Sequence, residues 1–441
     1  MKNFIEIKKI IKPFNKTIEV SGDKSISIRC VLMASQAIGV SRLYNLLESE
    51  DVLNSLNSIK KLGIKFKKKK KFYEIYGYGI NGYNLNKNII INAGNSGTLA
   101  RLILGLLVNS RKQVTIIGDK SLSRRDFTRV TDPIKLFGAN IISNKGGLPL
   151  KVKGSEFLRP INYIEKLGSA QCKSSVMLAA LKTPGTTVIK AKKSRNHTEL
   201  IFKFLKIPMR ITKSKEFDFL EIDGLYNFKS FDYIIPGDIS SSAFFLVLAL
   251  LSNKSKIVIK NVNVNDSRIG IINILNKMNA KILLKNKKFY NGEKIADIIV
   301  QGKRELKSIN CPESFNSSAI DEFLVIFLVA AKAKGISKFK NLSELNKKES
   351  PRLEIATKIL NKMGVKILRD ADNIQIYGNP NLNLKGKYII NNFRKDHRVF
   401  MMSCIAALSF GGKWKIDDKD SIKTSFPTFL NLLKKLGAQI T

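Results

Sequence analysis

Cysteine, histidine and long apolar runs are scarce in this sequence of 441 residues. Its four cysteines lie far apart without a CxxC pair, and it has two histidines, so nothing indicates a disulfide framework or a metal site. No apolar run approaches the roughly 18 residues that a membrane helix needs. Residues 1–15 mix Lys and Glu with Ile and Phe and lack the apolar core of a signal peptide. These absences predict a cytoplasmic protein that uses no metal and no cofactor.

Acidic residues are also few, with 35 Asp and Glu against 77 Lys and Arg, and the formal net charge is +42. Such a charge could bind nucleic acid through counterion release. However, the lysines are spread along the whole chain, with one dense run at Lys67–Lys71, and no zinc-finger or aromatic RNA-binding motif occurs. A Lys-, Asn- and Ile-rich composition explains the charge as well, and we expect no nucleic-acid partner. A basic protein would still attract small anionic substrates.

A small polar turn followed by an apolar helix recurs six times, roughly every 70 to 80 residues. Because such a helix is apolar on nearly every side, it must be buried on every side. A second, Lys-faced amphipathic helix recurs in each repeat and ends at Gly or a substitute before a strand. The apolar copies begin near Gly22, Gly94, Gly168, Gly237, Ser317 and Asp396. The expected glycine C-caps are Gly63, Gly138, Gly364 and Gly437.

These repeats predict an α/β protein built from one small module used six times. Three repeats make a domain of ordinary size, near ~200 residues. We therefore expect one domain over residues 21–235 and a discontinuous one over residues 1–20 plus 236–441, with the strand Phe4–Ile11 completing the second domain. If the buried helices run parallel, their N-termini meet at one end of each domain, and two such ends face to face would form a cleft for anions.

Cationic side chains cluster at these helix starts, beyond what capping alone requires. In SGDKSISIR, Lys24 and Ser25 begin a helix, and Arg29 follows Ser25 by one turn on the same face. A lysine at a helix N-terminus is electrostatically unfavourable, so Lys24 indicates function rather than stability. The full set of such cations is Lys24, Arg29, Arg101, Arg125, Arg195, Lys348, Arg352 and Arg398.

The turn GNSGTLAR resembles a phosphate-cradling loop, although no GK[ST] follows as in a P-loop. Its Thr98 and Arg101 share one helical face. In the second half, Asp321 precedes a strongly apolar helix, where it could accept a proton near bound anions. Lys348 and Arg352 are spaced as i and i+4, as on one helical face.

The motifs carry more weight in combination than singly, and the chain resembles the 3-phosphoshikimate 1-carboxyvinyltransferase (EPSP synthase) family from about Ile11 to about Pro427. That resemblance implies two domains, each of three βαβαββ-type units around buried parallel helices. It also implies transfer of the enolpyruvyl group of phosphoenolpyruvate to the 5-hydroxyl of shikimate 3-phosphate, with release of phosphate, and makes the chain a glyphosate target. The motifs that carry it are SGDKSISIR, GNSGTLARL, GSAQ, KKESPRL and KDHR.

The resemblance also implies a set of site residues, and bidentate Arg side chains suit a substrate with a carboxylate and a phosphate. Asp321 is the candidate base, Glu349 the candidate acid, and Lys24 could stabilise charge or carry a proton. The residues implied for phosphoenolpyruvate are Lys24, Gly97, Arg125, Gln171, Lys348, Arg352 and Arg398. Those implied for shikimate 3-phosphate are Lys24, Ser25, Arg29, Ser169, Gln171, Ser194, Arg195, Asp321 and Lys348.

Several positions depart from the family's usual pattern. Pro351 replaces Asp before Arg352, and Asp126 replaces Pro after Arg125, so these two positions bear on the local geometry. Lys395 and Thr424 are further departures, whereas Ala170 and Glu344 resemble the second of the family's two sequence classes.

Two other functions compete with this interpretation. The sister transferase that acts on UDP-N-acetylglucosamine shares the architecture but carries a reactive Cys in a mobile loop, and the matching segment Gly118–Asp126 has none. An RNA-phosphate cyclase would need a nucleotide-binding insert and a nucleophilic His. The expected partners are therefore the two small substrates, bound by a monomer.

Overall fold

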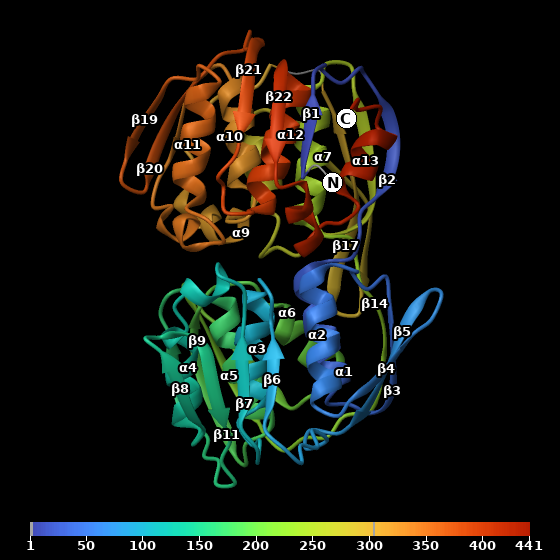
Figure 1. Ribbon diagram of the computed structural model, residues 1–441, viewed down its shortest axis with the longest axis vertical. Helices are drawn as coiled ribbons and strands as arrows, with labels where there is room; N and C mark the ends of the chain where they lie inside the picture. Colours follow the sequence, from blue (N-terminus) through green and yellow to red (C-terminus); the bar gives the residue numbers. More distant parts are fainter. Residues whose placement is uncertain (1–2, 303–304) are drawn as a thin grey trace. The chain divides into compact units, whose positions relative to one another are not determined.

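The computed structural model describes residues 3–302 and 305–441 (Figure 1). The chain divides into two compact units, each with its own apolar core. Unit 1 comprises Met1–Ser21, Pro236–Phe289 and Lys294–Thr441, and unit 2 comprises Gly22–Ile235 and Tyr290–Glu293. The short Tyr290–Glu293 turn belongs to unit 2, although the segments on both sides of it belong to unit 1. The repeat pattern does not predict this assignment. None of the helices among the described residues is long and apolar enough to cross a membrane.

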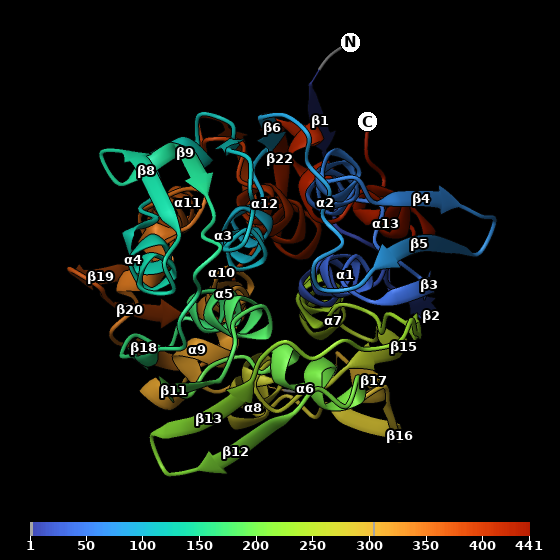
Figure 2. The ribbon, with the colours of Figure 1, turned by 90° about the horizontal axis from the view of Figure 1, so that it is seen from below.

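Three buried helices fill the middle of unit 2. They are α1 (Lys24–Ala34), α3 (Gly97–Leu106) and α5 (Ala170–Leu181), and almost all their residues are buried. In Figure 2 their sheets lie on the outside of this group. The amphipathic helices of the same repeats bury only one side. These are α2 (Glu50–Lys61), α4 (Thr128–Leu136) and α6 (His197–Phe204).

Each repeat of unit 2 contributes one four-stranded sheet with the same topology: a parallel pair followed by two antiparallel pairings. The first sheet has the order β14 (Asp232–Ile234), β3 (Ile38–Tyr44), β5 (Phe72–Tyr78) and β4 (Lys65–Lys68). The second has β6 (Ile89–Asn92), β7 (Val114–Ile117), β9 (Gly147–Lys153) and β8 (Asn140–Asn144). The third has β10 (Asn162–Glu165), β11 (Thr186–Lys192), β13 (Phe217–Asp223) and β12 (Met209–Lys213).

Unit 1 has the same design. Its buried helices are α7 (Ile239–Leu251), α10 (Phe323–Lys332) and α12 (His397–Phe410), and every residue of α7 and α12 is buried. The sequence pattern of apolar residues on every side therefore correctly predicted that α7 and α12 are buried on every side. The outer helices are α8 (Gly270–Lys277), α11 (Arg352–Lys362) and α13 (Phe429–Lys435), and a short α9 (Asn316–Ala319) precedes α10.

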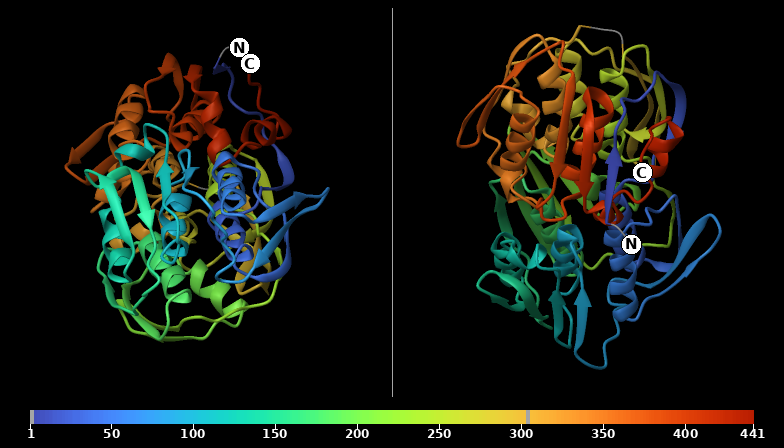
Figure 3. Two further views of the ribbon diagram at one scale, coloured as in Figure 1. Left: turned by 60° about the horizontal axis from the view of Figure 1, so that its bottom comes forward. Right: turned by 45° about the horizontal axis from the view of Figure 1, so that its top comes forward.

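The N-terminal segment supplies strands to two sheets of unit 1. β2 (Asn15–Glu19) pairs in parallel with β15 (Lys256–Asn263), next to β17 (Glu293–Gln301) and β16 (Leu283–Tyr290). β1 (Phe4–Ile7) pairs antiparallel with β22 (Gly411–Asp417), whose other neighbour is β21 (Leu384–Ile390) (Figure 3, right). The remaining sheet contains β18 (Gly335–Phe339), β20 (Asn373–Gly378) and β19 (Ile367–Asp370).

The outer helices end as the sequence predicts. The second residue after each outer helix has a positive φ, which favours Gly because a Cβ is strained there. Four of the six positions are glycines with φ between 75° and 115°, and Lys206 and Asn279 take the other two at 56° and 69°. The fold is α/β with three modules per unit, which confirms the predicted fold class.

Candidate active site

The start of α1 in unit 2 holds Lys24 by an ion pair. Asp23 caps the helix by accepting a hydrogen bond from the Ile26 amide at 2.9 Å. Lys24 Nζ lies 3.0 Å from Asp51 Oδ2, and Asp51 belongs to the first turn of α2. The charge of Lys24, which opposes the dipole of α1, is thus offset by a carboxylate of α2. About a fifth of the Lys24 side chain remains exposed. Sequence spacing gave no indication of Asp51.

Arg29 is buried and joins three helices of unit 2. Its Nε donates to Thr198 Oγ1 at 2.8 Å, and its Nη2 donates to Ser174 Oγ at 3.0 Å. Nη1 donates to the carbonyl of Ser25 at 3.0 Å, one turn back, as the predicted shared face of α1 requires. These three acceptors are neutral oxygens, and they orient the guanidinium.

A second group forms around the start of α3. Arg101 Nη1 donates to Gln171 Oε1 at 3.0 Å, and Gln171 Nε2 donates to Thr98 Oγ1 at 2.9 Å. A Cβ on Gly97 would lie 2.7 Å from Arg101 Nη1 and 3.0 Å from Arg125 Nη1, so this glycine lets two guanidiniums converge. Burial, with Arg125 nearby, lowers the pKa of Arg101 to about 10, and the group is still charged at neutral pH.

The other residues expected in unit 2 lie at the starts of α5 and α6. Ser169 caps α5 by accepting from the Cys172 amide at 3.3 Å. Ser194 and Arg195 follow β11 and precede α6. Ser194 Oγ is buried and has no hydrogen-bond partner within the described part of the chain. A buried hydroxyl in that position is available to a ligand.

Asp126 stabilises its surroundings rather than disturbing them. Its carboxylate accepts from the Thr128 amide at 2.8 Å and from the Thr128 hydroxyl at 2.7 Å, just before α4. Partial burial opposes its charge, but these hydrogen bonds prevail and lower its pKa. Its backbone carbonyl also accepts from Arg101 Nη2 at 3.3 Å. Arg125, the preceding residue, donates to Asn95 Oδ1 at 2.9 Å.

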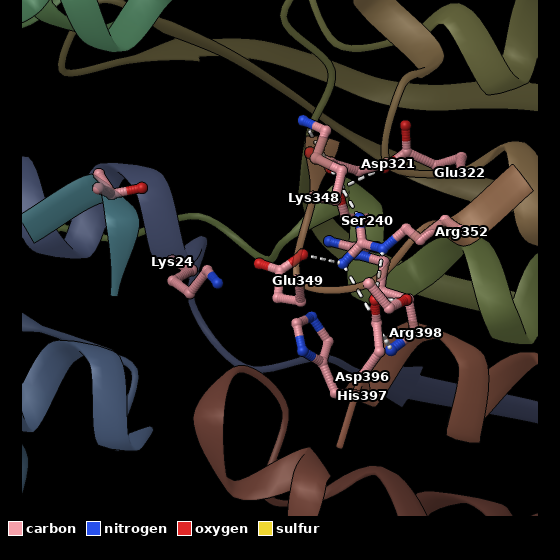
Figure 4. Close-up of polar contacts among 12 residues, drawn as sticks. Lys24, Ser240, Asp321, Glu322, Lys348, Glu349, Arg352, Asp396, His397 and Arg398 are labelled. Atoms are coloured by element: carbon pink, nitrogen blue, oxygen red, sulfur yellow. Dashed lines mark hydrogen bonds and ion pairs between the residues drawn. The ribbon is translucent and has the colours of Figure 1, made fainter. Parts of the chain in front are cut away.

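In unit 1, Arg352 is surrounded by carboxylates. It donates to Asp396 Oδ2 at 2.9 Å from Nε, to Glu349 Oε2 at 2.5 Å from Nη2 and to Asp321 Oδ1 at 3.4 Å from Nη1 (Figure 4). Burial of its side chain opposes the charge, but Asp396, Glu349 and Asp321 raise the pKa of Arg352. Asp321 and Glu349, the expected base and acid, are therefore brought together on one guanidinium.

Lys348 and Arg352 do not share a helical face, contrary to what their spacing suggested. Lys348 has an extended backbone, with φ −85° and ψ −154°, at the end of the 3-10 turn η3 (Ser343–Lys347), and α11 begins only at Arg352. Pro351 contributes to the difference, since a proline disfavours a helical conformation at Ser350 before it and so separates Lys348 from α11. Lys348 Nζ nevertheless lies 3.6 Å from Asp321 Oδ1, the same oxygen that Arg352 contacts.

Arg398 is a buried guanidinium at the start of α12. Asp396 caps this helix by accepting from the Arg398 amide at 2.9 Å. Arg398 Nη1 is buried and has no hydrogen-bond partner among residues 3–302 and 305–441. A buried cationic N–H is costly without an acceptor, so this atom indicates an anion site. His397, the preceding residue, is buried, and its Nδ1 lies 3.3 Å from Thr424 Oγ1.

The strongly apolar helix begins directly after Asp321 and Glu322, as the sequence predicts. The repeat that starts near Ser317 opens with the short α9, which ends at Ala319, and α10 starts at Phe323. Asp321 lies in the turn between them. Glu322 precedes α10 without capping it, and its carboxylate instead accepts from Ser240. Neither Glu322 nor Asp396 was among the expected site residues, although Asp396 stood in the KDHR motif.

Comparisons with known proteins agree on one family. The family model described as EPSP synthase (3-phosphoshikimate 1-carboxyvinyltransferase) matches residues 8–433. A 3-phosphoshikimate 1-carboxyvinyltransferase of Ruthia magnifica is 38% identical over 440 residues, covering 98% of each chain. One from Thermoanaerobacter sp. (strain X514) is 39% identical over 429 residues, covering 96% of this chain and 98% of its own.

Solved structures extend the agreement to the fold. EPSP synthase from Acinetobacter baumannii superimposes with a TM-score of 0.87 at 32% identity, covering 99% of both chains. The enolpyruvyl transferase NikO from Streptomyces tendae superimposes with a TM-score of 0.78 at 13% identity, covering 99% of this chain and 98% of that one. The second similarity concerns the fold alone.

Proposed function

Because the chain belongs to the EPSP synthase (3-phosphoshikimate 1-carboxyvinyltransferase) family, we propose that the residues at its helix starts bind the two substrates of that reaction and move its protons. The reaction transfers the enolpyruvyl group of phosphoenolpyruvate to the 5-hydroxyl of shikimate 3-phosphate and releases phosphate. It belongs to the shikimate pathway of aromatic amino acid biosynthesis. The observation that carries the assignment of residues is the buried Nη1 of Arg398, for which an anionic oxygen is the natural acceptor.

Phosphoenolpyruvate has a carboxylate and a phosphate, and each unit offers cations to it. In unit 1 we assign it to Arg398, Arg352 and Lys348, of which Arg352 is already oriented by carboxylates. In unit 2 the convergence of two guanidiniums on Gly97 supports the same ligand, because planar N–H forks match such oxygens. The residues assigned in unit 2 are Lys24, Gly97, Arg125 and Gln171.

Shikimate 3-phosphate combines a phosphate, a carboxylate and hydroxyls. The buried hydroxyl of Ser194 and the neighbouring Arg195 suit its phosphate. Arg29 is oriented by hydroxyl and carbonyl acceptors and suits a second anionic group. The complete set assigned to this substrate is Lys24, Ser25, Arg29, Ser169, Gln171, Ser194, Arg195, Asp321 and Lys348.

The proton transfers follow from the bonds that change. The 5-hydroxyl oxygen attacks the carbon that carries the phosphate, while the neighbouring methylene carbon takes up a proton and becomes a methyl group. Loss of phosphate and of one methyl proton then restores the double bond. Asp321 takes the hydroxyl proton, Glu349 donates the proton to the methylene carbon, and Lys24 stabilises the developing charge. Asp321 Oδ1 lies 3.6 Å from Lys348 Nζ and 3.4 Å from Arg352 Nη1, so two cations hold this carboxylate in place.

We also infer that the enzyme acts in the cytoplasm as a monomer, uses no cofactor and has no nucleic-acid partner. Its lysines are distributed along the chain rather than gathered in a binding motif. Light scattering at working concentration tests the monomer, and retention on RNA at moderate salt would contradict the absence of a nucleic-acid partner.

The test of the proposed assignments is phosphate release measured with both substrates, with each alone, and with UDP-N-acetylglucosamine in place of shikimate 3-phosphate. We expect release only with phosphoenolpyruvate and shikimate 3-phosphate together. In the same assay Arg398→Ala should raise the KM for phosphoenolpyruvate and leave that for shikimate 3-phosphate nearly unchanged. An unchanged KM for phosphoenolpyruvate would remove Arg398 from the site.

A further inference from the structure

A buried polar cluster lies within unit 1 at the starts of α7 and α10. It comprises Asp238, Ser240, Arg268 and Glu322, and the last three are at most 2% exposed. Arg268 Nη2 lies 2.8 Å from Ser240 Oγ and 3.5 Å from Asp238 Oδ1. Ser240 Oγ in turn contacts Glu322 Oε1. The motifs that indicated the function include neither Arg268 nor Glu322.

The direction of these hydrogen bonds follows from the groups themselves. A guanidinium can only donate, so Ser240 accepts from Arg268. The single hydroxyl proton of Ser240 then points to the carboxylate of Glu322, which can only accept when ionised. The result is a directed chain from Arg268 through Ser240 to Glu322. Such a chain fixes the side chain of Glu322 in one place, because a buried carboxylate that loses its donor is costly.

Glu322 is the immediate neighbour of Asp321, and the two side chains have different partners. Figure 4 shows Asp321 with Lys348 and Arg352, whereas Glu322 contacts Ser240. The backbone of Glu322 joins both flanking helices: its N–H donates to the Ala319 carbonyl at 2.9 Å, and its carbonyl accepts from the Ile326 amide at 3.1 Å. Glu322 therefore anchors the turn that carries Asp321.

We propose that Glu322, held by the hydrogen bond from Ser240 and Arg268 behind it, is a positioning residue that fixes Asp321 for proton transfer. This inference rests on the proposed role of Asp321 as the base. Asp321 lies in the turn between α9 and α10, so the anchor on the next residue helps to set where its carboxylate lies. A misplacement of about 1 Å at a reacting group can cost roughly 100-fold in rate.

The experiment compares two serines of the same helix in the full-length enzyme. Ser240→Ala removes the donor to Glu322, whereas Ser242→Ala, the matched control, removes a hydroxyl that donates only to the Asp238 carbonyl at 2.9 Å. We expect Ser240→Ala to lower kcat by about 10- to 100-fold, with both KM values within about twofold of the wild type. Ser242→Ala should keep the wild-type kcat. A merely structural role would lower the melting temperature of Ser240→Ala without lowering kcat per folded molecule.

A second pair of variants keeps the test decisive if Ser240→Ala folds poorly. Glu322→Ala should lower kcat as much as Ser240→Ala does. Glu322→Gln, which still accepts a hydrogen bond from Ser240, should have a kcat close to that of the wild type. Wild-type kcat in both Ser240→Ala and Glu322→Ala overturns the inference. Asp321→Asn distinguishes the role of Asp321 as base from the positioning role of Glu322. If Asp321→Asn retains turnover, the proposed role of Asp321 is wrong. If Asp321→Asn loses turnover while Glu322→Ala stays fully active, only the positioning role is contradicted.

Discussion

The helix starts of the two units hold their arginines in different ways. In unit 2, Arg29 and Arg101 donate to hydroxyl, amide and carbonyl oxygens. In unit 1, Arg352 donates to the carboxylates of Asp321, Glu349 and Asp396. Neutral acceptors orient a guanidinium and leave its charge for a ligand, whereas carboxylates offset the charge and can themselves exchange protons. The comparison teaches that unit 2 is suited to hold anions, whereas unit 1 combines an anion site at Arg398 with carboxylates suited to acid–base chemistry.

Lys24 departs from this pattern, because it is a cation of unit 2 that pairs with a carboxylate, Asp51. Lys24→Ala should lower kcat by about 100-fold or more, since it removes charge stabilisation at the reacting group. Its melting curve should stay cooperative, because Lys24 belongs to no apolar core. Asp51→Asn, which removes only the ion pair that holds Lys24, should lower kcat by less. Phosphate release and thermal melting check both, and the exposed Lys61→Ala serves as control. Near wild-type turnover of Lys24→Ala would exclude it from the site.

Arg398 sharpens the comparison within unit 1, because its Nη1 is not satisfied within the described residues whereas Arg352 is surrounded by carboxylates. Arg398→Lys keeps the charge but loses the planar fork, so the KM for phosphoenolpyruvate should rise by roughly 10- to 100-fold. The control is Arg369→Lys on the exposed strand β19, which should behave as wild type. Steady-state kinetics with phosphoenolpyruvate varied decides the matter, and an equal KM in both variants would contradict the assignment.

Gly97 tests the convergence of guanidiniums in unit 2. We predict that the wild type is sensitive to glyphosate, in competition with phosphoenolpyruvate. In Gly97→Ala the added methyl group would meet Arg101 and Arg125 and crowd the longer inhibitor more than the substrate. Resistance should increase by roughly 10- to 100-fold, with a smaller rise in the KM for phosphoenolpyruvate. Inhibition constants of the two proteins check this, and equal constants would show that Gly97 does not line the site.

The smallest expected effect concerns Asp126, a carboxylate of unit 2 that we assign to structure alone. Asp126→Ala should lower the free energy of unfolding by about 1 kcal/mol at neutral pH, as for the loss of a helix cap, without changing kcat. Because the pKa of Asp126 is lowered in the folded state, its contribution is present above the ordinary value of about 3.9 and is lost as pH falls through the folded pKa. Denaturant unfolding of both proteins at neutral and acidic pH measures this. A fall in kcat would mean that Asp126 shapes the site.

Local patterns in the sequence predicted the modules well. The buried helices, the glycine C-caps and the shared face of Ser25 and Arg29 all depend on residues within one or two helical turns, where periodicity and capping chemistry act directly. The family's fold and reaction followed from motifs in a fixed order, and the comparisons confirm both.

Contacts between distant segments could not be predicted in this way. Asp51 reaches Lys24 from the next helix, and Ser240 reaches Glu322 across 82 positions, so no spacing rule connects them. Pro351 was visible as a departure, but its consequence for Lys348 depends on how the chain enters α11. The roles assigned to individual site residues remain predictions for the same reason, since they depend on where the substrates bind.

The difference between the two units is tested most directly by measuring substrate binding and turnover side by side in Asp321→Asn and Arg29→Gln. Calorimetry with shikimate 3-phosphate and the phosphate-release assay should give opposite results for the two. We predict that Asp321→Asn binds this substrate within about threefold of the wild type yet turns over about 1,000-fold more slowly. Arg29→Gln should bind it about 10- to 100-fold more weakly. Undiminished turnover in Asp321→Asn, or undiminished binding in Arg29→Gln, would contradict the account.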